Sequence, residues 1–216
     1  MWRGVEIFLS LTTTYGHTFL EEMFASGAVE IRRDADAKVL SLGLGAGYIN
    51  SYLHYNFPNM DITTVELDPA MLRIAKKWYA LDEDYRHRVI IDDGLNYMKC
   101  AAESGIQYEV VHLDICTTDP DAKSLCPIEI FFTEEPVRVL SKLISERGSL
   151  NSKTENSILY GIPIKCLRGV VIVNVVSERY DSNVIANEIM SCTNITRPDC
   201  LDVACRKFAG YSIADG

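Results

Sequence analysis

The chain lacks several features that would exclude an ordinary globular fold. None of its apolar runs approaches the roughly 20 residues that a membrane-spanning helix needs. The briefly apolar first eleven residues carry Glu6 and lack a convincing cleavage site, so we expect no signal peptide there. Internal repeats and low-complexity tracts are also missing. With 216 residues, 48% of them hydrophobic, the sequence indicates a globular protein of ordinary size with one sizeable core.

Metal-binding and disulfide patterns are missing as well. The seven cysteines are an odd number, no C-x-x-C pair occurs, and none of the four histidines stands at ligand spacing from a cysteine. The cysteines are Cys100, Cys116, Cys126, Cys166, Cys192, Cys200 and Cys205. We therefore expect no metal site, no disulfide scaffold, and the reduced thiols of a cytoplasmic protein.

Positive charge is scarce. The chain has 21 lysines and arginines against 30 aspartates and glutamates, for a formal net charge of −9. An acidic surface repels phosphate backbones, which disfavours nucleic acid as a partner. It suits cationic partners instead, such as amines or a lysine-rich or N-terminal segment of another protein.

The most informative feature present is a glycine-rich turn between a strand and a helix. An apolar strand at 39–42 runs into Gly43, Gly45 and Gly47, and a helix pattern follows at 48–56. Glycine allows the backbone to approach a ligand without a Cβ in the way. The free N–H groups at the start of the helix attract a negative group. This arrangement is typical of a nucleoside-binding site over a parallel sheet.

An acid follows the next strand, and the glycine spacing narrows the choice of ligand. The strand at 61–66 ends in Glu66, whose carboxylate can accept two ribose hydroxyl protons. The spacing is G-x-G-x-G rather than the G-x-G-x-x-G of dinucleotide folds, and no arginine follows Glu66 to bind a 2′-phosphate. It suits a smaller anion, such as the carboxylate of S-adenosylmethionine. A glycine-rich turn in another kind of α/β protein is the less favoured interpretation.

Two further strands also end in acids. The strand at 88–91 is followed by Asp93, and the strand at 108–113 by Asp114. Asp93 would accept the adenine amino group, and Asp114 would face the reacting sulfonium. Because aspartate also favours helix N-caps, capping alone is an equally good interpretation of Asp93. Leu67 and Gly94, which directly follow these acids, complete the expected cofactor site.

The alternation of strands and helices predicts an α/β fold with a doubly wound, mostly parallel, Rossmann-like sheet. We expect a lead-in helix within residues 1–37 and a cofactor-binding domain at 38–216. An insert at 149–168 interrupts the domain before a strand at 169–176. Towards the C-terminus the pattern of strands and helices weakens, so the last strands of the sheet could be incomplete. We expect a helix within 181–191 and only a doubtful strand at 201–208. Trp78 is expected to pack in the interior, and His17 to lie on the surface.

Four segments, VLSLGLGAG, TTVELDPAMLRIAKKWY, IDDGLNYM and YEVVHLDICTTDP, resemble the class I S-adenosylmethionine-dependent methyltransferases. Within them the chain is most similar to the spermidine-synthase-like branch, and there to the enzymes that methylate elongation factor 1-alpha. The resemblance covers roughly residues 15–145 and resumes at 169–180. It implies that the three glycines cradle the methionine part of the cofactor, that Glu66 binds the ribose and Asp93 the adenine, and that Asp114 lies beside the reaction centre.

The chain departs from the family at two places. Ala46 replaces the acid that spermidine synthases carry within the glycine loop, and their D-S-S-D-P run reads Asp114-Ile115-Cys116-Thr117-Thr118-Asp119-Pro120 here. Cys116 also stands where the elongation-factor enzymes are expected to carry an acid. The loss of the acid in the glycine loop and the loss of the Ser-Ser pair argue against aminopropyl transfer, the reaction of spermidine synthases.

The resemblance implies transfer of a methyl group to an amine, a lysine or an N-terminus, of a protein such as elongation factor 1-alpha. Asp114 or Asp119 would orient the ammonium and accept its proton. For Asp119, a structural role in a turn before Pro120 is the slightly favoured interpretation. An aminopropyltransferase and a non-catalytic cofactor-binding module remain as alternatives, and the sequence does not predict the oligomeric state.

Overall fold

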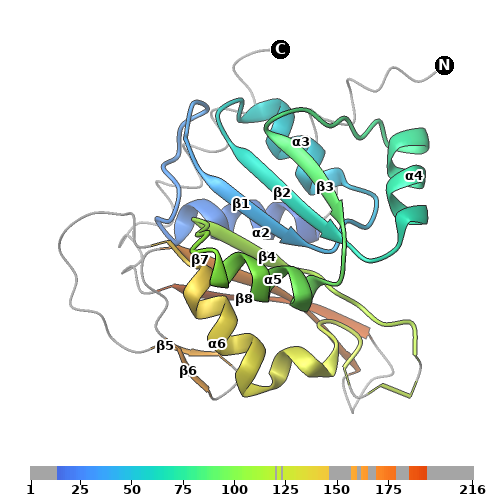
Figure 1. Cartoon of the computed structure of the whole chain (residues 1–216), viewed down its shortest axis with the longest axis vertical. Helices are drawn as coiled ribbons and strands as arrows, with labels where there is room; N and C mark the ends of the chain where they lie inside the picture. The colour runs from blue at the N-terminus through green and yellow to red at the C-terminus, as the bar shows by residue number, and fades with distance from the viewer. Residues whose placement is uncertain are drawn as a thin grey trace.

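The computed structural model describes residues 14–119, 121–122, 124–145, 157–159, 162–164, 169–178 and 185–193. Helices and strands alternate along most of these ranges (Figure 1). The helices are α2 (Thr14–Ala25), α3 (Tyr48–Asn56), α4 (Pro69–Trp78), α5 (Gly94–Glu103), the 3₁₀ helix η1 (Glu129–Phe132) and α6 (Glu134–Leu143). The strands are β1 (Lys38–Leu42), β2 (Asp61–Glu66), β3 (His87–Ile91), β4 (Val110–Leu113), β5 (Ser157–Leu159), β6 (Ile162–Ile164), β7 (Val170–Glu178) and β8 (Ile185–Thr193).

Six of the strands form one sheet in the order β3-β2-β1-β4-β7-β8. The first five are parallel, and β8 runs antiparallel to β7. In the register of the sheet, Leu42 at the end of β1 pairs with Val65 on one side and with Leu113 on the other. The strand order reverses direction at β1 and β4, which is where open α/β sheets bind ligands. The predicted fold class is confirmed.

The sheet is buried on both faces. One core cluster joins alternate strand residues to α5 and α6, with Met98 and Leu140 fully buried. The other joins the intervening strand residues to α2 and α3, with Phe19 and Leu53 fully buried. In Figure 1, α5 and α6 lie in front of the sheet and α2 lies behind it. Burial on both faces explains why the parallel strands are nearly continuous apolar runs.

Local signals determine where several helices begin and end. The Asp68 side chain accepts a hydrogen bond from the Ala70 N–H at 2.7 Å, and Pro69 is the first residue of α4. This is the N-cap and proline arrangement that the sequence indicates. The lead-in helix α2 ends in a different way: Gly27, with φ 76, follows its last turn.

Two predictions are wrong. The helix expected within 181–191 is absent, because β8 occupies 185–193 as a strand. It pairs with β7 along nine residues, and this pairing with a long neighbouring strand outweighs the weak local helix pattern. Trp78 does not pack in the interior: it is 67% exposed at the end of α4, where Lys77 Nζ lies 4.9 Å from its ring centre. Of the α4 residues, only Ala75 is buried.

The insert contains a small element of its own. Within 149–168, β5 and β6 form an antiparallel pair separate from the main sheet. The rest of the insert, the first 13 residues and the doubtful strand at 201–208 lie outside the described residues. The division into lead-in, domain and insert therefore stays a prediction. In the described part of the chain, no helix is both long and apolar enough to cross a membrane.

Candidate active site

The residues that the sequence singles out gather at one edge of the sheet. Because β1, β2, β3 and β4 are parallel, their carboxyl ends lie together. Glu66 is the last residue of β2, and Gly43, Asp93 and Asp114 follow the ends of the other three strands. The Gly43 N–H donates to the Val65 carbonyl at 2.9 Å, and the Asp114 N–H donates to the Leu42 carbonyl at the same distance. The chain therefore brings together residues that are more than 70 positions apart.

Gly43 connects the two central strands. It has φ 96, and a Cβ built on it would lie 2.2 Å from the Asp114 carbonyl oxygen. Both the backbone conformation and the close contact require glycine at this position. Its role is to let the end of β1 lie directly against the end of β4.

The other two glycines of the loop differ from each other. A Cβ on Gly47 would lie 2.5 Å from Leu81 Cδ1, so this glycine faces the protein interior. A Cβ on Gly45 would meet none of the described atoms within 4 Å. Of the three glycines, Gly45 is therefore the one that faces open space at the edge of the sheet. A ligand laid against this loop would contact the backbone there.

Glu66 holds the glycine loop in place. Its Oε2 accepts a hydrogen bond from the Leu44 N–H, and its Oε1 accepts one from the Asp68 N–H, both at 2.9 Å. A carboxylate has about four lone-pair sites, so each oxygen can accept a further bond from a ligand hydroxyl. The next residue, Leu67, is 69% exposed beside it.

Asp93 is the N-cap of α5. Its Oδ1 accepts a hydrogen bond from the Asn96 N–H at 2.9 Å, so the capping interpretation of this aspartate is what the geometry shows. Asp93 is exposed, whereas Gly94 is buried and a Cβ on it would lie 2.7 Å from Ile115 Cδ1. Gly94 thus serves packing against the segment after β4.

Asp114 is held by a residue that the sequence reasoning missed. The Asn174 Nδ2 donates a hydrogen bond to Asp114 Oδ1 at 2.7 Å. Asn174 belongs to β7, beside β4, and is 5% exposed. It interrupts an otherwise apolar strand, Val170 to Val176, and a lone amide in such a run was the available signal.

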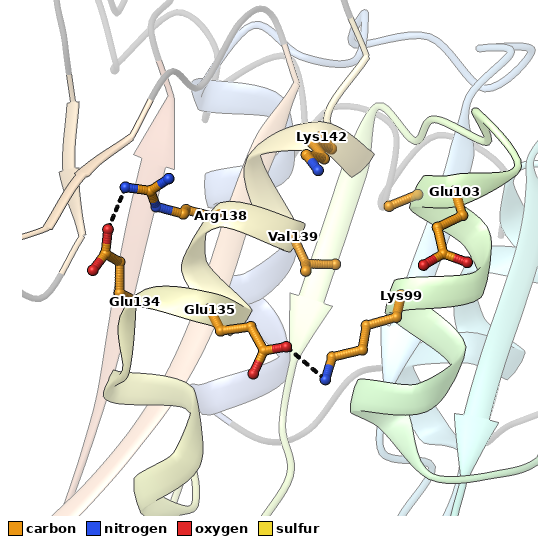
Figure 2. A pocket seen from close by; sticks show the side chains of 8 residues that line it. Lys99, Glu103, Glu134, Glu135, Arg138, Val139 and Lys142 are labelled. Atoms are coloured by element: carbon orange, nitrogen blue, oxygen red, sulfur yellow. Dashed lines mark ion pairs between the residues drawn. The ribbon is translucent and has the colours of Figure 1, made fainter.

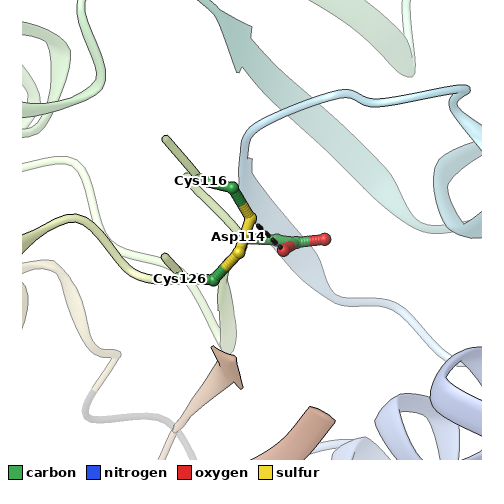
Figure 3. A group of neighbouring side chains, drawn as sticks. All are labelled: Asp114, Cys116 and Cys126. Atoms are coloured by element: carbon green, nitrogen blue, oxygen red, sulfur yellow. Dashed lines mark hydrogen bonds between the residues drawn. A yellow bond between two sulfur atoms is a disulfide. The ribbon is translucent and has the colours of Figure 1, made fainter. Parts of the chain in front are cut away.

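The segment after β4 contains a disulfide, which corrects the expectation of reduced thiols. Cys116 and Cys126 are bonded, with their Cα atoms 4.4 Å apart, and the Cys116 Sγ lies 3.4 Å from Asp114 Oδ1 (Figure 3). Their separation of ten residues gave no recognisable pattern in the sequence. The free cysteine in the described part of the chain is Cys100, which is exposed.

Asp119 lies within the disulfide-closed loop. Its Oδ1 accepts a hydrogen bond from the Asp121 N–H at 3.0 Å, and its own N–H donates to Thr117 Oγ1 at 3.1 Å. These contacts fit the turn interpretation of Asp119. Among contacts to described residues, Asp114 bonds to another strand of the sheet and Asp119 bonds within its own loop.

Two histidines of the sheet are buried: His112 in β4 and His87 at the start of β3. His112, in β4, packs on Phe19 with ring centres 4.3 Å apart, and its Nδ1 lies 3.3 Å from Ser41 Oγ. Burial lowers the pKa of His112 from 6.5 to about 4, against the opposing effect of the Asp114 charge. Burial, with the nearby His54, likewise lowers the pKa of His87 to about 4. Both rings are therefore neutral at pH 7 and belong to the core.

A separate groove lies between α5 and α6 (Figure 2). It has a volume of about 680 Å³ and contains no residue of the predicted site. Its charges largely pair with each other: Lys99 Nζ lies 2.7 Å from Glu135, and Arg138 pairs with Glu134. The groove lies on a helix-covered face, away from the carboxyl ends of the strands.

The chain is similar to curated proteins over the part that contains this site. It is 29% identical over 174 residues to the eEF1A lysine and N-terminal methyltransferase homolog of Drosophila melanogaster, which covers 76% of the chain. The human eEF1A lysine and N-terminal methyltransferase is 30% identical over 122 residues, or 55% of the chain. A polyamine aminopropyltransferase of Vibrio vulnificus is 27% identical over 117 residues, which are 54% of the chain and 37% of that protein.

The chain spans only about a quarter of the length of the methyltransferases: the matches cover 24% of the Drosophila protein and 18% of the human one. No protein-family model matches the chain.

Solved structures agree with the observed fold. Human methyltransferase-like protein 13, in complex with SAH, superposes with a TM-score of 0.70 at 23% identity, over 94% of this chain and 95% of that one. A probable spermidine synthase from Corynebacterium glutamicum gives a TM-score of 0.54 at 14% identity, over 95% of this chain and 71% of that one. The predicted resemblance is thus confirmed, and the chain has the fold of the class I, spermidine-synthase-like methyltransferases.

Proposed function

We propose that this chain is an S-adenosylmethionine-dependent methyltransferase that methylates an amine of a protein, either a lysine or an N-terminus. The observation that carries the proposal is the contact between the two halves of the site. Gly43 of the glycine loop lies against the Asp114 backbone, so a carboxylate held by Asn174 lies next to a loop suited to the cofactor. The similarity to eEF1A lysine and N-terminal methyltransferases supports the same activity.

The residues at the edge of the sheet fit the cofactor. The open space over Gly45 leaves room for its methionine part beside the first turn of α3, which has no side-chain cap. The remaining lone pairs of Glu66 suit the ribose hydroxyls, and the exposed Asp93 suits the adenine amino group. When bound, S-adenosylmethionine supplies a methyl group already activated on a sulfonium. The protein therefore mainly has to align the acceptor.

Asp114 prepares the acceptor. An ammonium has no lone pair, so the amine must lose a proton before it reacts. Asp114 orients the ammonium and accepts that proton, with Asp119 as the second candidate. With that proton removed, the amine would have a lone pair free to accept the methyl group that the bound cofactor would supply. The charge of the chain, −9, favours a cationic acceptor.

Elongation factor 1-alpha is the proposed partner. The two curated methyltransferases carry it in their names, and a cytoplasmic location would give access to it. Because the chain spans about a quarter of those proteins, its own acceptor has to be measured. An aminopropyltransferase is the second candidate, favoured by the similarity to the Vibrio protein. It would use decarboxylated cofactor and putrescine.

The test combines binding and turnover. Calorimetry with S-adenosylmethionine and with its decarboxylated form should show binding of the first and weaker binding of the second. Radiolabelled methyl transfer to purified elongation factor 1-alpha should then produce labelled protein. Binding of the decarboxylated form together with conversion of putrescine would establish the second candidate. Cofactor binding without label in that factor or in any protein of a lysate would establish a non-catalytic module.

A further inference from the structure

We infer that Asn174 is a substrate-positioning residue, whose side-chain carbonyl accepts a hydrogen bond from the acceptor amine while its NH₂ group holds Asp114. The inference rests on the proposed function and deepens it, because it assigns the recognition of the amine to two residues on neighbouring strands. No match to a known motif in the sequence marks Asn174 for this role.

The register of the sheet places Asn174 beside Asp114. Leu113 pairs with Val173, so the residues that follow them stand next to each other, Asp114 just after the end of β4 and Asn174 in the middle of β7. The distance from Asn174 Nδ2 to Asp114 Oδ1 is 2.7 Å. A carboxylate oxygen accepts and an amide NH₂ donates, which fixes the orientation of the amide. Its carbonyl oxygen must therefore point away from that carboxylate oxygen.

The carbonyl oxygen of Asn174 is buried and unpaired. Asn174 is 5% exposed, and its Oδ1 accepts no hydrogen bond from the described residues. Four apolar residues, Val170 to Val173, precede it in β7 and are fully buried. Burying an amide oxygen without a donor is unfavourable, so a buried acceptor next to a catalytic carboxylate points to a donor that arrives with the substrate.

The two side chains offer a defined set of groups to that substrate. The Asp114 carboxylate and the Asn174 carbonyl are both acceptors, and one of the two N–H groups of the Asn174 amide already donates to Asp114. An ammonium has three N–H donors and no acceptor, and after losing one proton it keeps two N–H donors and a lone pair. It can then bond both oxygens and still attack the methyl group. A hydroxyl has a single donor and leaves one oxygen unpaired, so the pair selects an amine over an alcohol.

Binding and turnover of matched variants test the inference. We would measure kcat and KM for purified elongation factor 1-alpha, and cofactor affinity by calorimetry. Asn174→Leu keeps the size of the side chain and removes its polar groups. It should raise KM for the protein at least tenfold and leave cofactor affinity within twofold of the wild type. Ile172→Val, a small change in the same buried strand, controls for packing and should leave both unchanged.

A charge exchange keeps the test informative if Asn174→Leu fails to fold. In Asp114→Asn with Asn174→Asp, the carboxylate and the amide exchange strands and can keep their mutual hydrogen bond. If both side chains contact the amine, the double variant should recover at least tenfold of the activity that Asp114→Asn loses. No recovery, or an unchanged KM in Asn174→Leu, would overturn the role of Asn174. If wild-type protein methylates no amine, the proposed function itself has failed.

A matched pair of acceptors tests the selectivity directly. We would compare two peptides with the N-terminal sequence of elongation factor 1-alpha, one with its N-terminal amine and one with a hydroxyl in place of that amine. Each peptide would be tested with the wild type and with Asn174→Leu. The wild type should prefer the amine at least 100-fold, and Asn174→Leu should reduce that preference at least tenfold. An undiminished preference in the variant would show that Asp114 alone selects the amine.

Discussion

The two halves of the candidate site differ in the way the chain builds them. In the cofactor half, the Leu44 N–H reaches Glu66 across 22 residues, within one strand–turn–helix–strand unit. In the acceptor half, Asp114 and Asn174 are 60 residues apart and meet only because β4 and β7 pair. The first half follows from a local unit found in many nucleotide-binding folds. The second depends on how distant strands come together, so it is the half in which this chain can differ from its relatives.

The largest expected effect is a loss of turnover in a variant of the acceptor half that leaves cofactor binding unchanged. Asp114→Asn keeps the shape of the side chain and removes the proton acceptor, so kcat should fall about 10²–10⁴-fold, the usual span for losing a general base. Cofactor affinity should stay within twofold in the same variant, as calorimetry would show. Loss of cofactor binding would mean that Asp114 belongs to the cofactor half. Full activity would mean that alignment suffices, or that Asp119 accepts the proton.

A pair of glycine substitutions tests the junction between the halves. Gly43→Ala introduces a Cβ 2.2 Å from the Asp114 carbonyl oxygen at φ 96, so the free energy of unfolding should fall by about 3 kcal/mol. Gly45→Ala meets open space and should cost only about 1–2 kcal/mol for its backbone conformation, while weakening cofactor binding. Chemical denaturation measures both. Equal losses of stability would show that the close contact at Gly43 is not what requires glycine.

Reduction of the disulfide, which lies in the acceptor half, should lower the stability of the protein. The Cys116–Cys126 bond closes a loop with a sequence separation of ten, and breaking it should lower stability by about 2–3 kcal/mol in the chain-entropy treatment. Melting with and without a reducing agent, and of Cys116→Ser, measures this effect. Cys100→Ser is the control because Cys100 is a free, exposed thiol. Mass spectrometry of the peptides that contain Cys116 and Cys126 gives a second readout. If the reducing agent changes neither the melting temperature nor the mass of these peptides, the two cysteines are not bonded in solution.

Glu66 provides the corresponding test of the cofactor half. Glu66→Ala removes a carboxylate that would hold the ribose, so cofactor binding should weaken by about 1.5–3 kcal/mol. Glu109 is a matched control: its Oε2 accepts a hydrogen bond from the Lys38 N–H at 2.7 Å, at the opposite edge of the sheet. Glu109→Ala should leave cofactor affinity unchanged in calorimetry. Unchanged affinity in Glu66→Ala would refute the assignment of the ribose to Glu66.

Acid should gradually lower the stability of the folded protein. The folded-state pKa values of His87 and His112, about 4, lie below the ordinary 6.5, so folding favours the neutral rings. Their contribution to stability is present above pH 6.5 and is lost as the pH falls from 6.5 towards 4. Denaturation between pH 7 and 5 should show this loss, and His87→Gln or His112→Gln should reduce its slope. A wild-type stability independent of pH would contradict the prediction.

Much of the fold follows from the sequence because its signals are local. The helix predicted at 48–56 and the strand predicted at 61–66 have the observed bounds, since glycine, proline and aspartate mark their ends. The strand β8 could not be predicted in the same way. Its conformation comes from pairing with β7, and the local pattern of 181–191 favours a helix instead.

The candidate site was predictable in position but not in detail. Glycines and acids after successive strands indicate where a ligand binds, because parallel strands share one carboxyl edge. The sequence does not show that Gly43 and Gly47 face the protein while Gly45 faces open space. It also does not show that Asn174 reaches Asp114, because that contact depends on the order of strands in the sheet.

The helix α2 has a consequence for any attempt to prepare a smaller fragment. It lies within the segment expected as a lead-in, yet Phe19, Leu20 and Met23 are fully buried against the face of the sheet that carries Val39 and Ile172. A fragment beginning at Lys38 would keep every glycine and acid of the site but expose that apolar face to water. Such a fragment would aggregate on expression, and failure to detect its activity would say nothing about the chemistry.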